Sequence, residues 1–543
     1  MPAREKETEM PYTGRPLGTL SVVLHAHLPY IRHPEHRYHL EENWLYEAIV
    51  ATYLPLLEVY RNLVRDGVRF RITMSMSPPL CAMLTDDLLK TRAAAYLDRL
   101  LRLGDEEIAR NHDNPTFLHL ARFYRERFGR LKDLYDAIGG DIVGAYRQLQ
   151  DDGFLEIVTV GATHGYLPAI REPAARRAQV QIAATQYHRH FGRWPRGIWL
   201  AECGYTEGVE DLLADAGIRY FFVDAHGLLY GRPQPPYGTA APVFTRAGVA
   251  AFGRDLESSK QVWSAEEGYP GDADYRDFYR DLGFDLPLEI IKPFIHPDGI
   301  RLHTGYKYYR VTGRVGLGDK EPYHPEWARE KAASHAANFL FNRQAQVSWL
   351  AEHMDRVPHL VTPYDAELYG HWWFEGPMFL DFLARKIHFD QDEIQMITPS
   401  EYLAEHTVNA VCEVAPSSWG DGGFSGVWID GPNDWIYRHQ HRAAARMVEL
   451  AEQYSRGSSD LERRVLNQLA RELLLLQSSD WAFILKTGTA MGYAISRVKA
   501  HVARFRRLDR ELSTGQIDQT WLANLESRDN LFADVDYRVY AGQ

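Results

Sequence analysis

The feature that most constrains the fold is a repeated alternation of short, strand-like apolar runs with helical stretches. Helical patterns over 41–65, 115–150 and 327–356 are among those that separate the runs. Seven runs are candidate strands, over 20–24, 70–74, 155–160, 198–201, 220–223, 249–252 and 360–362. Alternation of this kind is typical of an α/β fold, in which crossover helices connect the strands of a parallel sheet.

Titratable residues follow the carboxyl ends of most of these strands. His25 and His27 follow the first strand and His164 the third, whereas Glu202 follows the fourth and Asp365 the seventh. An α/β barrel carries its active site at the carboxyl ends of its strands. An open sheet usually places its ligand at a single switch point. Because these residues are distributed over many strands, we predict a barrel of seven β/α units.

The length of 543 residues predicts two or three domains rather than one core. We expect a polar tail over 1–18, a barrel with insertions over 19–400 and a helical domain over 401–543, where long amphipathic patterns begin to dominate. The Pro/Gly-rich segment at about 228–242 is incompatible with regular structure. It is either a plain connecting loop or a lid over the cleft, with Tyr237 at its tip.

Composition excludes several functional classes. The net charge of −12 argues against a nucleic-acid partner, whose phosphates it would repel. Three scattered cysteines are too few for a disulfide framework or a zinc knuckle. The charged N-terminus lacks the apolar region of a signal peptide, and no run approaches the roughly 18 apolar residues of a membrane span. We therefore expect a cytoplasmic protein with no membrane association.

Glu202 and Asp365 have matching surroundings. Each follows a short apolar run and is flanked by Tyr or Trp. A single acid in such a turn most often caps a helix. Two acids among aromatic rings can be shielded from water so that their pKa values separate. Such a pair is what cleavage of a glycosidic bond requires, because one carboxylate attacks and the other donates a proton.

Other side chains leave two interpretations open. His25, His27 and His164 are either ligands of a metal ion or hydrogen-bond partners of sugar hydroxyl groups. Nothing else has metal-ligand spacing, so no metal or cofactor is predicted. Several tryptophans near Gly, Ser and Asp are either half-buried packing residues or platforms for pyranose rings. The candidate platforms for pyranose rings are Trp263, Trp419 and Trp428.

Five segments occur in a characteristic order along the chain. They are His-Ala-His-Leu-Pro (25–29), Gly-Ala-Thr-His-Gly-Tyr (161–166), Trp-Leu-Ala-Glu-Cys-Gly-Tyr (199–205), the aromatic-rich run 362–376 and the surroundings of Trp419. These segments resemble the signature regions of glycoside hydrolase family 57, and most closely those of its 1,4-α-glucan branching enzymes. The resemblance covers roughly residues 20–540 and implies a (β/α)7 barrel, a small inserted region and a C-terminal helical domain that completes the cleft.

The resemblance also implies roles for individual residues. Glu202 is expected to be the nucleophile and Asp365 the general acid/base, with His25 and Trp263 lining the donor site. Tyr237 is expected on a flexible loop. The residues expected to contact the glucan are Arg254, Gly271, Trp419 and Asp480.

The expected activity is that of a retaining transglycosylase. It cleaves α-1,4 bonds and forms α-1,6 branches in amylose- or glycogen-type glucans, which serve as both donor and acceptor. Retention predicts carboxyl groups about 5–5.5 Å apart. The alternatives are an α-amylase or 4-α-glucanotransferase with the same two carboxylates, a metal-dependent polysaccharide deacetylase and a non-catalytic glucan-binding protein. The sequence leaves open whether the chain is a monomer or a dimer.

Overall fold

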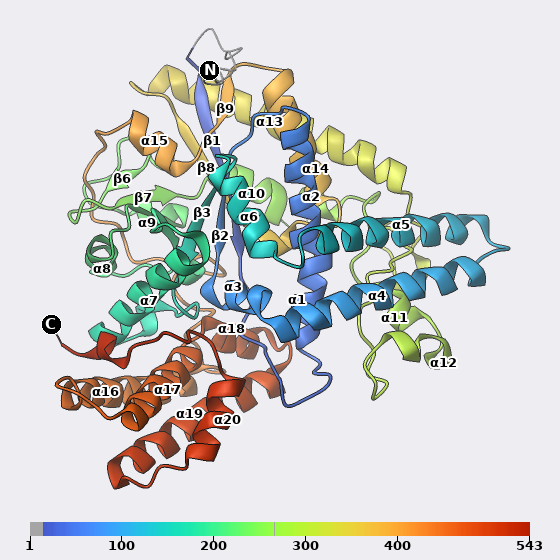
Figure 1. Ribbon diagram of the computed structural model, residues 1–543. Coiled ribbons are helices and arrows are strands. Elements are labelled where there is room, and N and C mark those ends of the chain that lie inside the picture. The colour runs from blue at the N-terminus through green and yellow to red at the C-terminus, as the bar shows by residue number, and fades with distance from the viewer. Residues whose placement is uncertain (1–14, 265–266, 543) are drawn as a thin grey trace, which may run out of the picture.

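The computed structural model describes residues 15–264 and 267–542, so most of the predicted N-terminal tail lies outside the described residues. One sheet of nine strands forms the centre of the molecule, and its strands point toward α18 in the lower half of Figure 1. The strands are β1 (Gly18–Ala26), β2 (Ile72–Met76), β3 (Leu155–Val160), β4 (Gly197–Trp199), β5 (Tyr220–Val223), β6 (Val243–Phe244), β7 (Ala250–Gly253), β8 (His359–Asp365) and β9 (Ile394–Met396).

Seven of the strands form a parallel barrel, which confirms the predicted fold class. Their order is β7-β5-β4-β3-β2-β1-β8. The register of β1 and β8 places His25 beside Asp365 at the carboxyl ends of both strands. Between β7 and β8, the backbone N–H of Asp255 donates to the carbonyl of Val361 at 2.8 Å. All nine residues of β1 are buried, as expected for a barrel strand covered on both faces.

Two strands and several strand boundaries differ from the prediction. The strand expected over 70–74 lies at Ile72–Met76. The two residues of β6 pair antiparallel to β7, and the three residues of β9 pair with the start of β1. Segments this short show no periodicity, and tertiary contacts decide their conformation.

Helices cover the outside of the barrel (Figure 1). The predicted helix over 41–65 is one helical segment with a π-helical turn at Ile49–Tyr53. The helical pattern over 115–150 forms two helices, which are separated where Gly139 and Gly140 have positive φ. The helices up to residue 405, of which α4, α5, α11 and α12 extend to one side of the barrel in Figure 1, are α1 (Glu42–Ala48), α2 (Leu54–Arg65), α3 (Pro78–Thr85), α4 (Asp87–Arg110), α5 (Pro115–Ala137), α6 (Ile142–Asp151), α7 (Pro173–Phe191), α8 (Val209–Asp215), α9 (Ala225–Leu229), α10 (Leu256–Trp263), α11 (Leu282–Asp285), α12 (Leu288–Ile291), α13 (Pro325–His353), α14 (Gly376–Phe389) and α15 (Pro399–Glu405).

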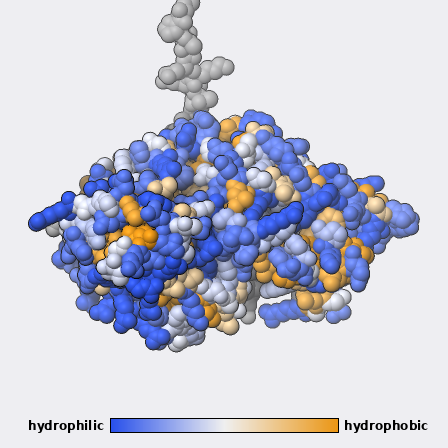
Figure 2. Space-filling view, turned by 60° about the horizontal axis from the view of Figure 1, so that its bottom comes forward, coloured by the Kyte–Doolittle hydropathy of each residue, from blue (hydrophilic) through white to orange (hydrophobic). Residues whose placement is uncertain are grey.

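The last five helices lie together at the end of the barrel where the strands terminate (Figure 1). Their buried leucines belong to the same continuous hydrophobic core as the barrel. Turned forward in Figure 2, this side of the molecule is mostly hydrophilic, with small separate apolar patches. The helices are α16 (Tyr437–Gln453), α17 (Asp460–Leu476), α18 (Ser479–Thr487), α19 (Met491–Thr514) and α20 (Gln519–Arg528).

The segment before α16 runs along the barrel. Val411 pairs with Phe244 of β6, and Ser417 pairs with Tyr205 just after β4. Residues soon after 400 therefore contact the barrel, and the domain division at 400 stays a prediction. None of the helices in the described part of the chain combines the length and the apolar character of a membrane span.

Candidate active site

Glu202 lies on an unusual turn at the end of β4. It is the middle residue of the short 3-10 helix Ala201–Cys203, and its φ is 62°, in the left-handed region that side chains other than glycine rarely adopt. Its carbonyl accepts a hydrogen bond from the backbone N–H of Trp419 at 2.9 Å. Strained backbone of this kind is concentrated at functional sites, where surrounding contacts hold it. Here the strain aims one carboxyl group at the barrel mouth.

Two hydrogen-bond donors hold the carboxylate of Glu202. The indole N–H of Trp419 donates to Oε2 at 2.8 Å, and the hydroxyl of Ser479 donates to Oε1 at 2.8 Å. Only 12% of the Glu202 side chain is exposed. Burial raises the pKa of Glu202 to about 7, although the hydrogen bonds from Trp419 and Ser479 favour the charged form.

Asp365 ends β8 in a group of carboxyl groups. Burial, then the proximity of Glu367 and Glu202, raise the pKa of Asp365 well above its usual range, while Arg254 acts in the opposite direction. Burial also raises the pKa of Glu367 to about 7. Oε1 of Glu367 accepts a hydrogen bond from the hydroxyl of Tyr53 at 2.5 Å. Both shifts favour the protonated form, so a carboxyl group disposed to donate a proton lies near Glu202.

A chain of hydrogen bonds runs from β2 to Glu202. Ser75 Oγ lies 2.6 Å from His25 Nδ1, His25 Nε2 lies 2.9 Å from His164 Nε2, and His164 Nδ1 lies 2.7 Å from Ser479 Oγ. Burial lowers the pKa of both imidazoles well below the usual value, so both are neutral. Because a carboxylate only accepts, Ser479 donates to Glu202 and accepts from His164, which fixes the tautomer of each imidazole along the chain.

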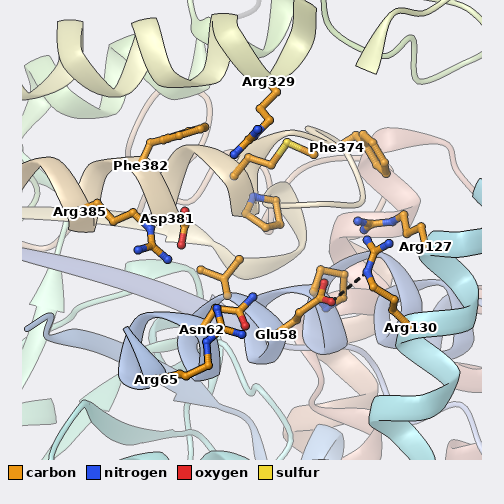
Figure 3. A pocket seen from close by; sticks show the side chains of 14 residues that line it. Glu58, Asn62, Arg65, Arg127, Arg130, Arg329, Phe374, Asp381, Phe382 and Arg385 are labelled. Carbon is orange, nitrogen blue, oxygen red and sulfur yellow. Dashed lines mark hydrogen bonds and ion pairs between the residues drawn. The ribbon is translucent and has the colours of Figure 1, made fainter. Parts of the chain in front are cut away.

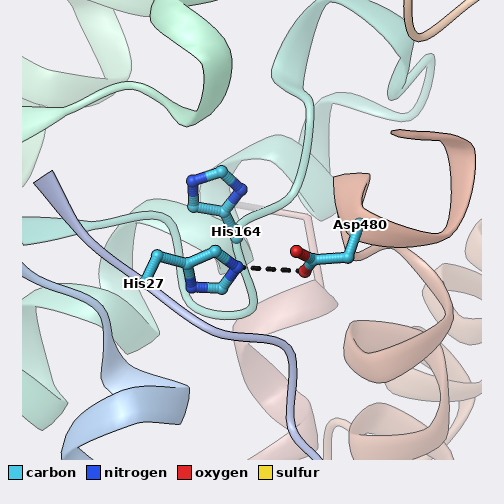
Figure 4. A group of neighbouring side chains, drawn as sticks. All are labelled: His27, His164 and Asp480. Carbon is cyan, nitrogen blue, oxygen red and sulfur yellow. Dashed lines mark hydrogen bonds and ion pairs between the residues drawn. The ribbon is translucent and has the colours of Figure 1, made fainter. Parts of the chain in front are cut away.

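His27, His164 and Asp480 form a second group beside this chain (Figure 4). His27 Nε2 lies 3.0 Å from Asp480 Oδ2, and the His27 ring stacks on His164 at 3.8 Å. Burial acts to raise the pKa of Asp480, but His27 and its hydrogen bond lower it to about 2. One ligand atom of each residue lies within 4.8 Å of the others, close enough to share a cation. The ring nitrogens of His27 and His164 already have hydrogen-bond partners. The geometry of the group is therefore that of a hydrogen-bond network.

Aromatic rings form a wall beside Glu202. Trp199 stacks on His25 at 4.9 Å, and Trp419 meets the edge of Trp199 at 5.0 Å. Trp263, which ends α10, meets Trp419 edge-on at 6.2 Å and is 36% exposed. Trp428 differs from the expected platform, because it is 2% exposed and stacks on a neighbouring tyrosine ring. Its buried ring has no open face for a sugar in this structure.

Two other predicted glucan contacts lie at the edges of the site. Arg254 follows β7, and its guanidinium donates to Asp224 at 3.2 Å and to Ser259 at 2.8 Å. Its positive charge opposes the rise in the pKa of Asp365, so the two side chains interact electrostatically. Gly271 is exposed and ends the short 3-10 helix Tyr269–Gly271, which contacts α10.

Tyr237 does not lie over the carboxylates, which corrects the prediction of a lid. Its hydroxyl donates to Asp355, and its ring packs under the guanidinium of Arg356 at 5.2 Å. Both partners precede β8, whose amino end is six residues and roughly 20 Å from Asp365. The loop therefore returns to the opposite end of the barrel, because these polar partners and the pairing of β6 hold it there.

Three side chains that sequence reasoning did not select contribute directly to the site. Ser479 contacts Glu202, Glu367 adjoins Asp365, and Tyr53 holds Glu367 from the π-helical turn between α1 and α2. Such turns are often found at functional sites. The position of Ser479 beside Asp480 in Ser-Ser-Asp-Trp was a usable signal, whereas Tyr53 lies in an ordinary amphipathic pattern.

A barrel whose mouth holds paired carboxyl groups, histidines and tryptophans is the scaffold of a carbohydrate-active enzyme. Comparisons with known proteins support the same class of enzyme. The model described as "Glycosyl hydrolase family 57" matches residues 21–284, and the one described as "1,4-alpha-glucan branching enzyme, C-terminal" matches residues 439–540. A 1,4-alpha-glucan branching enzyme of Thermococcus kodakarensis is 35% identical over 97% of this chain and 79% of the relative.

Two solved structures superpose over nearly the whole chain. The Thermococcus enzyme gives a TM-score of 0.88, with 97% of each chain covered. A structure described as an α-amylase from Thermotoga maritima is 42% identical, covers 97% of this chain and 99% of its own, and gives a TM-score of 0.91. This chain belongs to glycoside hydrolase family 57.

Proposed function

We propose that the chain is a 1,4-α-glucan branching enzyme that works as a retaining transglycosylase. Glu202 is the nucleophile and Asp365 the general acid/base. The observation that carries this proposal is the unequal environment of the two carboxyl groups. Glu202 accepts two hydrogen bonds that favour its charged form, whereas Asp365 is crowded by Glu367 and Glu202 and favours its neutral form. Branching enzymes similar over almost all of the chain support the choice of reaction.

The first step transfers part of an α-1,4-glucan to the protein. An oxygen of Glu202 attacks the anomeric carbon as the bond from that carbon to the departing O4 breaks. The proton of Asp365 goes to O4, which leaves as a hydroxyl group at the new non-reducing end. The neutral His25 and His164 hold Ser479 so that its hydroxyl keeps the Glu202 oxygen in place.

The second step forms the branch. Asp365, now ionised, takes the proton from the 6-hydroxyl of an acceptor glucan, whose oxygen attacks the anomeric carbon and releases Glu202. Water in the same place gives hydrolysis. The wall formed by Trp199 and Trp419 shields the Glu202 side of the site from water and thereby favours a sugar acceptor. The cytoplasm stays the predicted location, and either a monomer or a dimer the predicted assembly.

One experiment separates branching from its rivals. Purified protein is incubated with amylose, the product is digested with an isoamylase, and reducing ends are counted before and after digestion. Branching predicts few new reducing ends before digestion and many after it. Glu202→Gln is the matched inactive control. A full rise before digestion, with none added by the isoamylase, refutes branching and establishes hydrolysis.

A specific observation favours hydrolysis as the second candidate. The Thermotoga structure described as an α-amylase resembles this chain over 97% of its residues. An α-amylase uses the same first step, so the same reducing-end count decides between the two. A 4-α-glucanotransferase predicts a third outcome, with few new reducing ends before digestion and none after it.

A further inference from the structure

A hollow on the outside of the barrel has a charge that the proposed reaction does not use. It has a volume of about 400 Å³, lies among α2, α5, α13 and α14, and includes neither Glu202 nor Asp365 in its lining. Figure 3 shows arginines directed toward it from several helices. Five arginines line it in a protein of net charge −12, namely Arg65, Arg127, Arg130, Arg329 and Arg385.

Three of these arginines already have carboxylate partners. Arg130 pairs with Glu58 at 3.3 Å. Arg385 pairs with Asp381 at 2.9 Å and with Asp66 at 2.8 Å. Arg65 pairs with the same Asp66 at 2.9 Å. Three acids therefore balance three arginines.

Arg127 and Arg329 form no ion pair with a carboxylate in the described ranges 15–264 and 267–542. Each instead lies over an aromatic ring, Arg127 over Phe374 at 4.5 Å and Arg329 over Phe382 at 5.8 Å. Figure 3 shows the guanidinium groups of both turned toward the hollow. The hollow therefore holds two guanidinium groups without an ion-pair partner, although Glu58 acts electrostatically on Arg127.

Arg127 is the more informative of the two because it is buried. It is 8% exposed, and its Nη2 has no hydrogen-bond partner within the part of the chain that the structure describes. Burial lowers its pKa to about 10, so the group is still charged at neutral pH. A buried guanidinium without an anion is costly, and natural proteins rarely retain one. Arg127 therefore keeps a hydrogen-bond donor that the side chains around it do not use.

We propose that this hollow binds a phosphorylated small molecule. A phosphate monoester carries close to two negative charges at neutral pH, which matches the two unpaired arginines. Planar guanidinium groups recognise phosphate oxygens with paired hydrogen bonds. Met378 and Phe382, which also line the hollow, offer an apolar surface for the rest of the ligand. The volume lies in the range of small-molecule sites. The inference does not depend on the branching activity.

The test measures binding of inorganic phosphate and of glucose 1-phosphate to the full chain by calorimetry at constant ionic strength. Unphosphorylated glucose reports any binding in the catalytic cleft. Arg127→Gln and Arg329→Gln are expected to weaken phosphate binding by about tenfold or more. Arg122→Gln is the matched control, because Arg122 is an exposed residue of α5 that does not line the hollow.

Arg329 is exposed, so its variant is informative even if the buried Arg127 variant does not fold. Circular dichroism checks the fold of every variant. Two results overturn the proposal. One is wild-type protein that binds neither phosphate nor glucose 1-phosphate. The other is phosphate binding that Arg329→Gln and Arg122→Gln leave equally unchanged.

Discussion

Replacing Trp419 with phenylalanine removes one hydrogen-bond donor from Glu202 and leaves a ring in its place. The indole N–H donates to Glu202 Oε2 at 2.8 Å in a largely buried site. Burial has already raised the pKa of Glu202 to about 7, and the hydrogen bond is one of the contacts that oppose a further rise. The variant is therefore expected to raise this pKa.

The size of the shift follows from the strength of the lost bond. A hydrogen bond to a charged group contributes about 1.5–3 kcal/mol, and one pKa unit corresponds to about 1.36 kcal/mol. The pKa of Glu202 should rise by about 1–2 units, from about 7 to about 8–9. The proposed nucleophile acts only when deprotonated, so the acid limb of kcat/KM against pH reports its pKa in the free enzyme. That limb should move to higher pH.

The assay is amylose consumption across the pH range, with kcat/KM fitted at each pH. Trp428→Phe is the matched control, because it removes a buried indole N–H that has no hydrogen-bond partner among the described residues. The control should leave the acid limb near pH 7. An acid limb at the same pH in Trp419→Phe, Trp428→Phe and the wild type would show that Glu202 does not control this limb.

Three further predictions concern Ser479, Tyr237 and the pair of His27 and Asp480. Ser479→Ala removes the other donor to Glu202 and should also move the acid limb up by about 1 unit or more, whereas Ser479→Thr, which keeps the hydroxyl, should restore it. Tyr237→Phe should leave the ratio of branches to reducing ends unchanged, because Tyr237 contacts Asp355 at the far end of the barrel; a loss of branches alone would contradict this placement. Treatment with a chelator should leave activity intact, because His27 and Asp480 already satisfy one another, and a loss restored by added metal would favour the deacetylase alternative.

The barrel and the carboxyl pair could be predicted from sequence because their signals are local. Each strand is a short apolar run followed by a polar turn, so neither Glu202 nor Asp365 requires knowledge of a distant partner. Pairing in the sheet then brings the strand ends together. The roles of both residues stay predictions until the variants are measured.

The rest of the site depends on contacts that no local pattern encodes. Ser479 reaches Glu202 across 277 positions of sequence, and its role depends on how α18 lies against the barrel mouth. The position of the loop around Tyr237 depends on Asp355 and on β6, although its proline content resembles that of many lids. The burial of Trp428 likewise results from packing, which its position near Gly, Ser and Asp in the sequence does not reveal.

In the proposed mechanism, Glu202 forms a covalent bond to the sugar while Asp365 moves the proton. A fluorinated glucosyl fluoride, which forms the glycosyl-enzyme faster than it is released, tests it by mass spectrometry of digested protein. One added sugar is expected on the peptide that contains Glu202, and none on that peptide in Glu202→Gln. A label on the peptide that contains Asp365, or turnover of the reagent by Glu202→Gln at the wild-type rate, would contradict it.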